Sequence, residues 1–229
     1  MNAIAIITAR GGSKRIPGKN KKDFLGKPII CYSIEAAISS GLFGEIMVST
    51  DDEEIAGIAK EAGASVPFMR SAATSNDFAS TDDVLMEVLE EYEKREKVFD
   101  YMACIYPTAP FVTAEKLKNA MNTLIEKKAS GVMPVVGFSF PPQRGMVVRN
   151  GRLEYCYPEN ALKRSQDLET IYHDCGQFYC YNVEKYRACR GNLPDGYVPV
   201  VVDETEVQDI DNFSDWKLAE IKYSMMREK

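Results

Sequence analysis

Residues 4–20 read IAIITARGGSKRIPGKN, an apolar and mainly β-branched run that stops abruptly at a loop rich in glycine and basic residues. The apolar run is typical of a strand buried on both faces of a sheet. Two adjacent glycines, Gly11 and Gly12, let the backbone approach a ligand closely and expose its N–H groups. Four basic side chains would supply charge for a polyphosphate: Arg10, Lys14, Arg15 and Lys19. Because open α/β sheets bind nucleotides where a buried strand feeds such a loop, the stretch predicts a nucleotide site.

Two familiar phosphate motifs do not match this loop. A P-loop needs four residues between its glycines and a Ser or Thr after its Lys. Here five residues separate Gly12 from Gly18, and Asn20 follows Lys19. The dinucleotide fingerprint G-x-G-x-x-G is also missing from the sequence. A basic surface turn would explain the same residues, but we favour a third kind of nucleotide loop.

Length and composition limit the function classes. The 229 residues suit one domain with a sizeable core. A net charge of −6 argues against a general nucleic-acid-binding protein, and no apolar stretch reaches the roughly 20 residues of a membrane helix. The N-terminal apolar run lacks a preceding basic region, so we do not expect a signal peptide. The six cysteines form no C-x-x-C pair, and we expect reduced thiols in a cytoplasmic protein, with disulfides as the alternative.

Strand-like and helix-like patterns alternate along the first 140 residues. Strands are predicted at 4–9, 45–50, 66–69, 101–106 and 131–138. Helices are predicted to begin near Pro28, Asp52, Ser80 and Thr113, and a last one at 214 or 215. Asp51 and Asp52 are interpreted as helix-start carboxylates, which suit the helix dipole. The alternation predicts an α/β fold with a mainly parallel sheet and helices on both faces.

The alternation breaks after Phe138. Pro141-Pro142 interrupts it, and Asn150-Gly151 between two short strands predicts a hairpin with a type I′ turn. Residues 158–170 are polar and irregular, and core-like sequence returns at 177–179 and 197–202. We therefore expect a single domain, 1–229, with an insertion at about 138–175 that projects from the sheet.

Residues 9–20 closely resemble the signature loop of the cytidylyltransferases that activate acidic sugars. This acylneuraminate (CMP-sialic acid synthetase) family includes the sialic acid, 3-deoxy-manno-octulosonate and pseudaminic acid enzymes. The resemblance covers nearly the whole chain and is strongest to the pseudaminic acid branch. It implies a Rossmann-like nucleotidyltransferase fold, and a reaction in which a sugar hydroxyl attacks the α-phosphate of CTP and pyrophosphate leaves. It also implies Mg²⁺ or Mn²⁺ and a homodimer built on the β-rich insertion.

The resemblance assigns the first loop to the triphosphate. Arg10, Lys14 and Lys19 match the family's triphosphate-binding positions, and Asn20 is expected to contact phosphate or to orient the loop. Arg15 is at least as well explained as a solvated surface residue. The nucleotide site is predicted to include the remaining loop residues Ala9, Gly11, Gly12 and Ser13.

A second motif, Asp209-Ile210-Asp211, matches the family's metal motif just before the last helix. In extended chain its two carboxylates point the same way. Paired carboxylates suit Mg²⁺, which prefers hard oxygen ligands and shares substrate phosphates. Without the resemblance, a solvated loop would be the simpler interpretation.

Further matches concern the base and the sugar. Arg70 and Ala79-Ser80-Thr81 match the base-recognition segment, although helix capping alone would explain Ser80 and Thr81. Tyr106-Pro107-Thr108 matches the segment beside the sugar. Sialic acid enzymes usually carry Gln at the Tyr106 position and Arg near Val112, which argues against sialic acid.

The insertion and the sequence after it supply further substrate candidates. Arg144 and Arg164 are candidates for binding the sugar carboxylate, reaching into the partner subunit's site, or else are surface arginines. His173, Gln177 and Tyr179 either line the pocket or pack structurally.

These observations predict a CMP-sugar synthetase that converts CTP and pseudaminic acid to CMP-pseudaminic acid and pyrophosphate. The alternatives are the same reaction on legionaminic acid, sialic acid or 3-deoxy-manno-octulosonate, or a non-catalytic nucleotide-binding module. No nucleic acid or membrane is expected as a partner.

Overall fold

A seven-stranded sheet forms the centre of the computed structural model, which describes residues 2–227. The strand order is β11-β6-β10-β5-β1-β4, and β9 pairs with β6. The strands β1, β4, β5, β6 and β11 run in one direction, while β9 and β10 run antiparallel to them. The bounds of the sheet strands are β1 Ala3–Thr8, β4 Glu45–Ser49, β5 Tyr101–Ile105, β6 Gly131–Gly137, β9 Tyr172–Asp174, β10 Phe178–Asn182 and β11 Val198–Val201.

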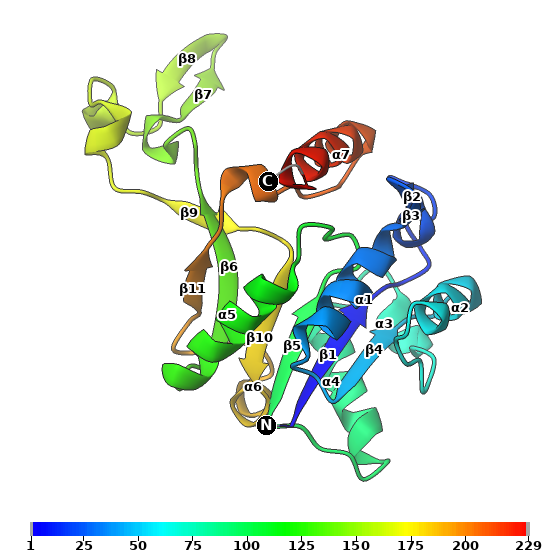
Figure 1. The fold of residues 1–229 in the computed structure, drawn as a ribbon. Coiled ribbons are helices and arrows are strands. Elements are labelled where there is room, and N and C mark those ends of the chain that lie inside the picture. The colour runs from blue at the N-terminus through cyan, green and yellow to red at the C-terminus, as the bar shows by residue number, and fades with distance from the viewer. Residues whose placement is uncertain (1, 228–229) are drawn as a thin grey trace.

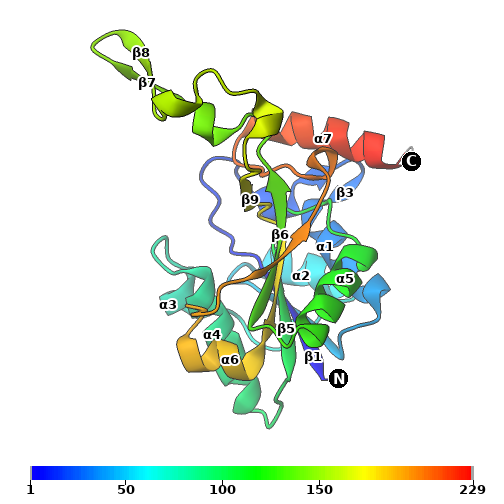
Figure 2. The ribbon, with the colours of Figure 1, turned by 90° about the vertical axis from the view of Figure 1, so that its left-hand side faces the viewer.

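Helices cover both faces of the sheet, as Figure 2 shows with the sheet seen near its edge. One face packs against α1, α2 and α5, and the other against α4 and α6. The strand β1 is buried on both faces, because Ala5 and Ile7 point to the first side and Ile4 and Ile6 to the second. The helix bounds are α1 Ile29–Ser40, α2 Glu53–Glu61, α3 Ala72–Ser75, α4 Thr81–Glu93, α5 Ala114–Glu126, α6 Val183–Cys189 and α7 Phe213–Arg227.

A third apolar cluster closes the carboxyl end of the sheet and includes residues of α7, the helix drawn in red in Figure 1. Phe24 lies at its centre, with its ring edge-to-face against Tyr32 at 5.4 Å and Trp216 at 5.5 Å between centroids. The short hairpin of β2 (Asp23–Phe24) and β3 (Lys27–Pro28) presents Phe24 to this cluster. The buried members are Ile16, Phe24, Ile29, Tyr32, Phe111, Ile210, Trp216 and Ala219.

The segment after β6 projects away from the sheet in both ribbon views (Figures 1 and 2). It contains the hairpin of β7 (Met146–Arg149) and β8 (Arg152–Tyr155). Asn150 and Gly151 have φ values of 50° and 75°, which confirms the predicted type I′ turn. Short 3₁₀ turns complete the described chain: Lys19–Lys21, Pro142–Arg144, Pro158–Asn160, Ser165–Asp167 and Glu204–Glu206.

The expected strand at 66–69 is wrong. Ser65 makes an isolated bridge to Met47, and the next backbone link to the sheet is from Arg70 N to Thr50 O at 2.8 Å. Pro67 lies between them and has no N–H to donate, so the ladder is interrupted there. The helices α3 and α6 are also absent from the sequence-based prediction. The other predicted strands and helices are present, with Pro28 capping α1 rather than lying in its first turn.

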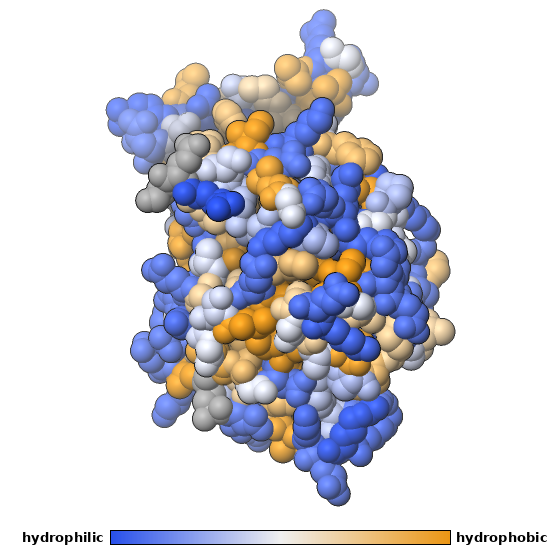
Figure 3. All heavy atoms as spheres, turned by 45° about the vertical axis from the view of Figure 1, so that its right-hand side comes forward, coloured by the Kyte–Doolittle hydropathy of each residue, from blue (hydrophilic) through white to orange (hydrophobic). Residues whose placement is uncertain are grey.

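The surface shows no continuous apolar belt on the face drawn in Figure 3, where apolar residues form separate patches among hydrophilic ones. Within residues 2–227, no helix combines the length and the apolar character needed to cross a membrane.

Candidate active site

The loop after β1 is fixed at two points. Ile16 is fully buried in the third cluster, and Asn20 is buried with its Nδ2 donating to Arg10 O at 2.8 Å. Gly18 has φ 63°, a left-handed conformation that favours glycine, and it introduces the 3₁₀ turn Lys19–Lys21. Asn20 therefore orients the loop, one of the two roles expected for it.

The two adjacent glycines have different surroundings. A Cβ at Gly11 would lie 2.9 Å from Asp52 Cβ, so this position has no room for a side chain. The Gly11 N–H donates to Asp51 Oδ1 at 2.8 Å. A Cβ at Gly12 would meet nothing within 4 Å. The interpretation of Asp51 as a simple helix-start carboxylate therefore missed its contact with the loop, whereas Asp52 does cap α2 by accepting from Glu54 N and Ile55 N.

A cavity of about 410 Å³ opens between this loop and the end of β5. It joins the basic loop to the Tyr106–Thr108 segment, which the sequence placed beside the sugar. The lining residues are Thr8, Arg10, Gly12, Ser13, Lys14, Arg15, Lys19, Asn20, Tyr106, Pro107 and Thr108.

A smaller cavity of about 240 Å³ adjoins the first, because Thr8 and Arg10 line both. It contains the four residues predicted for base recognition, Arg70 and Ala79, Ser80 and Thr81. The remaining lining residues are Thr74, Asn76, Asp77 and Val84. Two segments that are about 60 residues apart in the sequence thus form one continuous site.

Arg70 is buried in the wall of the smaller cavity. Its Nε donates to Ser49 Oγ at 3.0 Å and its Nη2 to Ser49 O at 2.7 Å, which fixes the guanidinium and leaves Nη1 unused by these bonds. Burial lowers the pKa of Arg70 to about 10, and the nearby Asp51 and Glu87 oppose that shift. The group is cationic at neutral pH and held rigidly.

Ser80 also caps α4. Its Oγ accepts from Asp83 N at 3.1 Å, and Asp83 Oδ2 accepts from Ser80 N at 2.9 Å, a complete capping box. The helix-capping role of Ser80 is confirmed, and its contact with a base stays a prediction.

The Asp209–Asp211 motif lies against the first loop. Ile210 is buried in the third cluster together with Ile16, and Lys19 Nζ donates to Ile210 O at 2.7 Å. Arg15 pairs with Asp211 at 2.7 Å, so it is not a free surface arginine. Burial is the largest influence lowering the pKa of Lys19, and the carboxylates of Asp211 and Asp209 oppose it.

The two carboxylates have the chemistry of a partial magnesium site. Burial and repulsion by Asp211 raise the pKa of Asp209, so its ionised form needs more compensating positive charge than the nearby Lys19 supplies. A divalent cation would provide that compensation, and two carboxylate ligands leave room for substrate phosphates and water. Within residues 2–227 no group of three or more His, Cys, Asp or Glu could hold a metal ion by itself. The donor set therefore fits an ion shared with phosphates.

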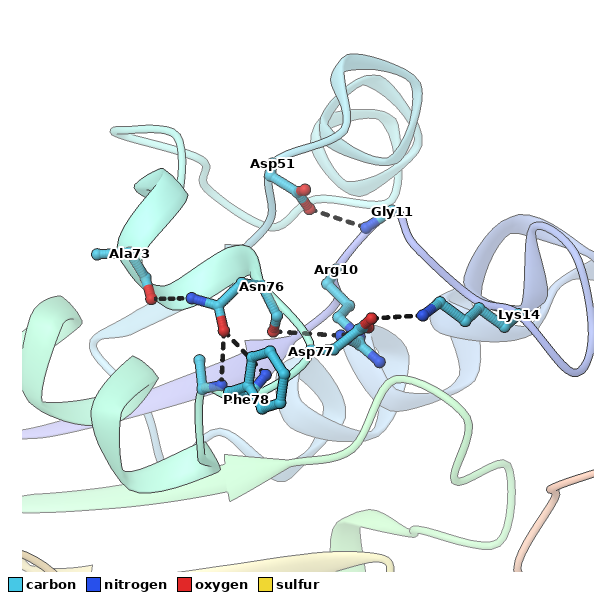
Figure 4. A network of polar contacts seen from close by, with 9 residues as sticks. Arg10, Gly11, Lys14, Asp51, Ala73, Asn76, Asp77 and Phe78 are labelled. Atoms are coloured by element: carbon cyan, nitrogen blue, oxygen red, sulfur yellow. Dashed lines mark hydrogen bonds and ion pairs between the residues drawn. The ribbon is translucent and has the colours of Figure 1, made fainter.

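The two basic residues nearest the start of the loop converge on one carboxylate (Figure 4). Asp77 Oδ1 accepts from Arg10 Nη1 at 2.9 Å, and Asp77 Oδ2 accepts from Lys14 Nζ. Sequence reasoning missed Asp77, because a single Asp in a polar loop has no distinctive pattern. Thr8 was also missed, although its place at the end of β1 could have indicated it.

Several predicted residues lie apart from the two cavities. Arg164 pairs with Asp167 of the 3₁₀ turn that follows it, and Arg144 contacts Ser165 Oγ at 3.4 Å. His173 packs against Phe138, with 4.6 Å between the ring centroids.

Three others are buried behind the site. Gln177 donates from Nε2 to Glu206 O at 2.7 Å, and its Oε1 has no hydrogen-bond partner within the described chain. Tyr179 donates to Asp174 and packs its ring edge-to-face on Tyr106, with 5.6 Å between centroids. Ala9 is buried in the core under the first loop.

Comparison with known proteins decides the family. The family model described as cytidylyltransferase matches residues 4–180, which include β1, the first loop and both cavities. The chain belongs to the cytidylyltransferase family. Membership confirms the predicted nucleotidyltransferase activity and implies CTP as its nucleotide substrate.

Curated cytidylyltransferases align with this one along its whole length. A pseudaminic acid cytidylyltransferase of Campylobacter jejuni is 37% identical over 235 residues, covering 100% of this chain and 99% of the relative. A CMP-N,N'-diacetyllegionaminic acid synthase of Legionella pneumophila is 31% identical, covering 96% and 95% of the two chains.

Solved structures support the same fold. A CMP:2-keto-3-deoxy-manno-octonic acid synthetase complexed with CTP superimposes with a TM-score of 0.68 at 21% identity, covering 100% of both chains. The α/β fold expected for this cytidylyltransferase is confirmed.

Because the pKa of Asp209 is raised, metal binding at this carboxylate should depend on pH. Protons and a divalent cation compete for this carboxylate, so Mn²⁺ affinity should fall as the pH drops, beginning above the ordinary Asp value of about 3.9. Mn²⁺ binding by the free protein, followed by water relaxation between about pH 4 and 7, measures this dependence.

Two variants complete this test. Asp209→Asn should weaken Mn²⁺ binding about tenfold or more, while Asp195→Asn, which removes a charge from an exposed turn, should not. Binding in the wild-type protein that does not vary over this range would contradict the assignment of the metal to Asp209.

Proposed function

We propose that this cytidylyltransferase converts CTP and pseudaminic acid to CMP-pseudaminic acid and pyrophosphate. The observation that carries the proposal is the junction of the two cavities at Thr8 and Arg10, which provides one compartment for a base and another for phosphates and sugar. The full-length likeness to pseudaminic acid enzymes supports this choice of sugar. The cytoplasmic location expected above remains part of the proposal.

The first loop would bind the triphosphate. Arg10, Lys14 and Lys19 surround the larger cavity, and the open space at Gly12 allows phosphate oxygens to approach the backbone. In this reaction the protein has little covalent chemistry to perform, and its main task is to position the substrates. These cations would align the α-phosphate with the attacking sugar hydroxyl and stabilise the charge that develops on the leaving pyrophosphate.

Asp209 and Asp211 would hold Mg²⁺ or Mn²⁺. When bound, the metal would neutralise charge on the phosphates. Lys19 contributes at the same place, since it donates to Ile210 O between the two carboxylates and also lines the larger cavity.

The smaller cavity would select cytosine. The immobile Arg70 lines this cavity and presents a donor to the carbonyl edge of the base. Ser80 and Thr81 line the same cavity from the start of α4.

Among the residues of the site, Tyr106 is the one that most supports pseudaminic acid over sialic acid as the substrate. It is half-buried in the wall of the larger cavity and held by bonds from Ser33 Oγ to its carbonyl oxygen and from its N–H to Gln177 O. Val112 is buried in the core, so the contrast with sialic acid enzymes depends on Tyr106 alone. Pseudaminic acid has a terminal deoxy carbon where sialic acid has a hydroxyl, and an aromatic wall suits the less polar group.

A panel of acidic sugars tests the proposal. With CTP at saturation, kcat/KM for sialic acid should be about 100-fold below that for pseudaminic acid, which corresponds to about 3 kcal/mol. Legionaminic acid and 3-deoxy-manno-octulosonate complete the panel, and CMP-sugar formation is the readout. Asp211→Ala serves as the negative control and should be about 100-fold slower with every sugar. Equal rates for sialic and pseudaminic acids would contradict the role of Tyr106, and no turnover with any sugar would favour a non-catalytic nucleotide-binding module.

We also propose a homodimer formed through the insertion. The projecting segment exposes large apolar side chains that a monomer would leave in water. The most exposed are Phe140, Val148, Leu153 and Leu162, with 90%, 71%, 69% and 99% of their surface accessible. In such a dimer Arg144 and Arg164 would reach the partner subunit's site and bind the sugar carboxylate.

Light scattering tests the dimer. The wild-type protein should have twice the chain mass of 25.7 kDa at micromolar concentration. Val148→Asp in β7 should shift it towards the monomer, whereas Val98→Asp, at a valine outside the insertion that is 65% exposed, should not. A wild-type monomer with full activity would contradict the proposal.

A further inference from the structure

Two of the proposed triphosphate ligands are already occupied by a carboxylate of the same chain. Asp77 accepts from Arg10 Nη1 at 2.9 Å with one oxygen and from Lys14 Nζ with the other (Figure 4). Arg10 Nη1 also lies 3.3 Å from Asn76 O. One anionic group thus bridges two cations of the loop, which is the arrangement that a phosphate would adopt there.

The loop that carries Asp77 is ordered by its own hydrogen bonds. Asn76 Oδ1 accepts from Phe78 N at 2.8 Å and from Ala79 N at 3.1 Å, and Asn76 Nδ2 donates to Ala73 O at 2.7 Å. These bonds order the backbone around Asp77, and the ion pairs with Arg10 and Lys14 hold its half-exposed carboxylate towards the basic loop. Arg10 belongs to both cavities and Asp77 to the smaller one, so their contact lies where the two cavities meet.

The carboxylate of Asp77 and the phosphates of a substrate would compete for the same two cations, because both are negatively charged. Hydrogen bonds from Lys14 and then Arg10 lower the pKa of Asp77, which keeps its carboxylate ionised at neutral pH. A triphosphate on the same two cations would place several negative charges beside that carboxylate, and like charges at contact distance repel. Asp77 must then give up at least part of its contact with Arg10 and Lys14.

We propose that Asp77 is a positioning residue that stands in for a substrate phosphate: it holds Arg10 and Lys14 in the free protein, is displaced by the triphosphate, and thereby weakens polyphosphate binding. The inference rests on the proposed role of the first loop. Because Asn76, Asp77 and Ala79 also line the smaller cavity, displacement of Asp77 changes the wall of the base site as the phosphates enter. The same contact would assist the departure of pyrophosphate.

The test uses tripolyphosphate, which carries the phosphates without a base, and titration calorimetry. Asp77→Asn keeps the shape of the side chain and removes its charge. It should bind tripolyphosphate about five- to tenfold more tightly than the wild type, as expected for the loss of two exposed ion pairs. The KM for CTP should fall by a similar factor while kcat does not rise, a split that a purely structural role would not produce.

A matched control is available in α2. Glu53→Gln removes the same charge near the same end of the sheet, from an exposed side chain with no hydrogen bond or ion pair in the described structure. It should change tripolyphosphate affinity less than twofold. In the wild-type protein, hydrogen exchange at Phe78 and Ala79 should quicken when tripolyphosphate binds.

The outcomes separate this inference from the proposed function. Equal or weaker tripolyphosphate binding by folded Asp77→Asn, with normal turnover of CTP and sugar, overturns the role of Asp77 alone. Tighter binding by the variant without turnover of any sugar supports Asp77 and overturns the proposed reaction. Failure of both proteins to bind tripolyphosphate overturns the role of Asp77 together with the proposed role of the first loop, and CMP-sugar formation then tests the proposed reaction separately.

Discussion

The site depends on the shared burial of two isoleucines that lie at opposite ends of the chain. Ile16 in the first loop and Ile210 between the two aspartates belong to one apolar cluster, which α7 covers. Burial of two such side chains contributes several kcal/mol, far more than any exposed ion pair at this site. Because Ile210 points into the cluster, its neighbours Asp209 and Asp211 are held beside Lys19 and Arg15. Apolar packing thus sets the geometry in which the charged groups act.

Charge in the free site is largely balanced within the chain. The basic loop is paired to Asp77 on one side and to Asp211 on the other, and the Gly11 N–H is bonded to Asp51. These contacts keep long, mobile side chains near the positions where a polyphosphate and a metal ion would need them. They are also exposed and individually weak, so a highly charged substrate can replace them. The side chains of such a site are ordered without substrate, and a substrate can still readily replace the ion pairs that order them.

The sequence correctly predicted those elements whose structure depends on residues that are close together in the chain. The β-branched run of β1, the glycine loop, the Asn150-Gly151 turn and the Ser80 cap all follow from a few adjacent residues. The contacts that were missed join residues far apart in the chain: Gly11 to Asp51 across 40 positions, and Arg10 to Asp77 across 67. No periodicity encodes such a pair, because it depends on how β1, β4 and α4 are placed by the sheet. The strand expected at 66–69 failed for a related reason, since apolar residues around Pro67 resemble a strand although the proline cannot complete the ladder.

Comparison of two isoleucine-to-alanine variants would test most directly whether apolar packing sets the geometry of the site. Ile210→Ala and Ile34→Ala each remove a buried isoleucine, the first from the cluster beneath α7 and the second from the core between α1 and the sheet. Both should lower the free energy of unfolding by about 2–5 kcal/mol in urea titrations. At a temperature where both remain folded, Ile210→Ala should lose tenfold or more of its kcat/KM for CTP, about 1.4 kcal/mol, while Ile34→Ala stays close to the wild type. Equal activity in the two variants would contradict the account.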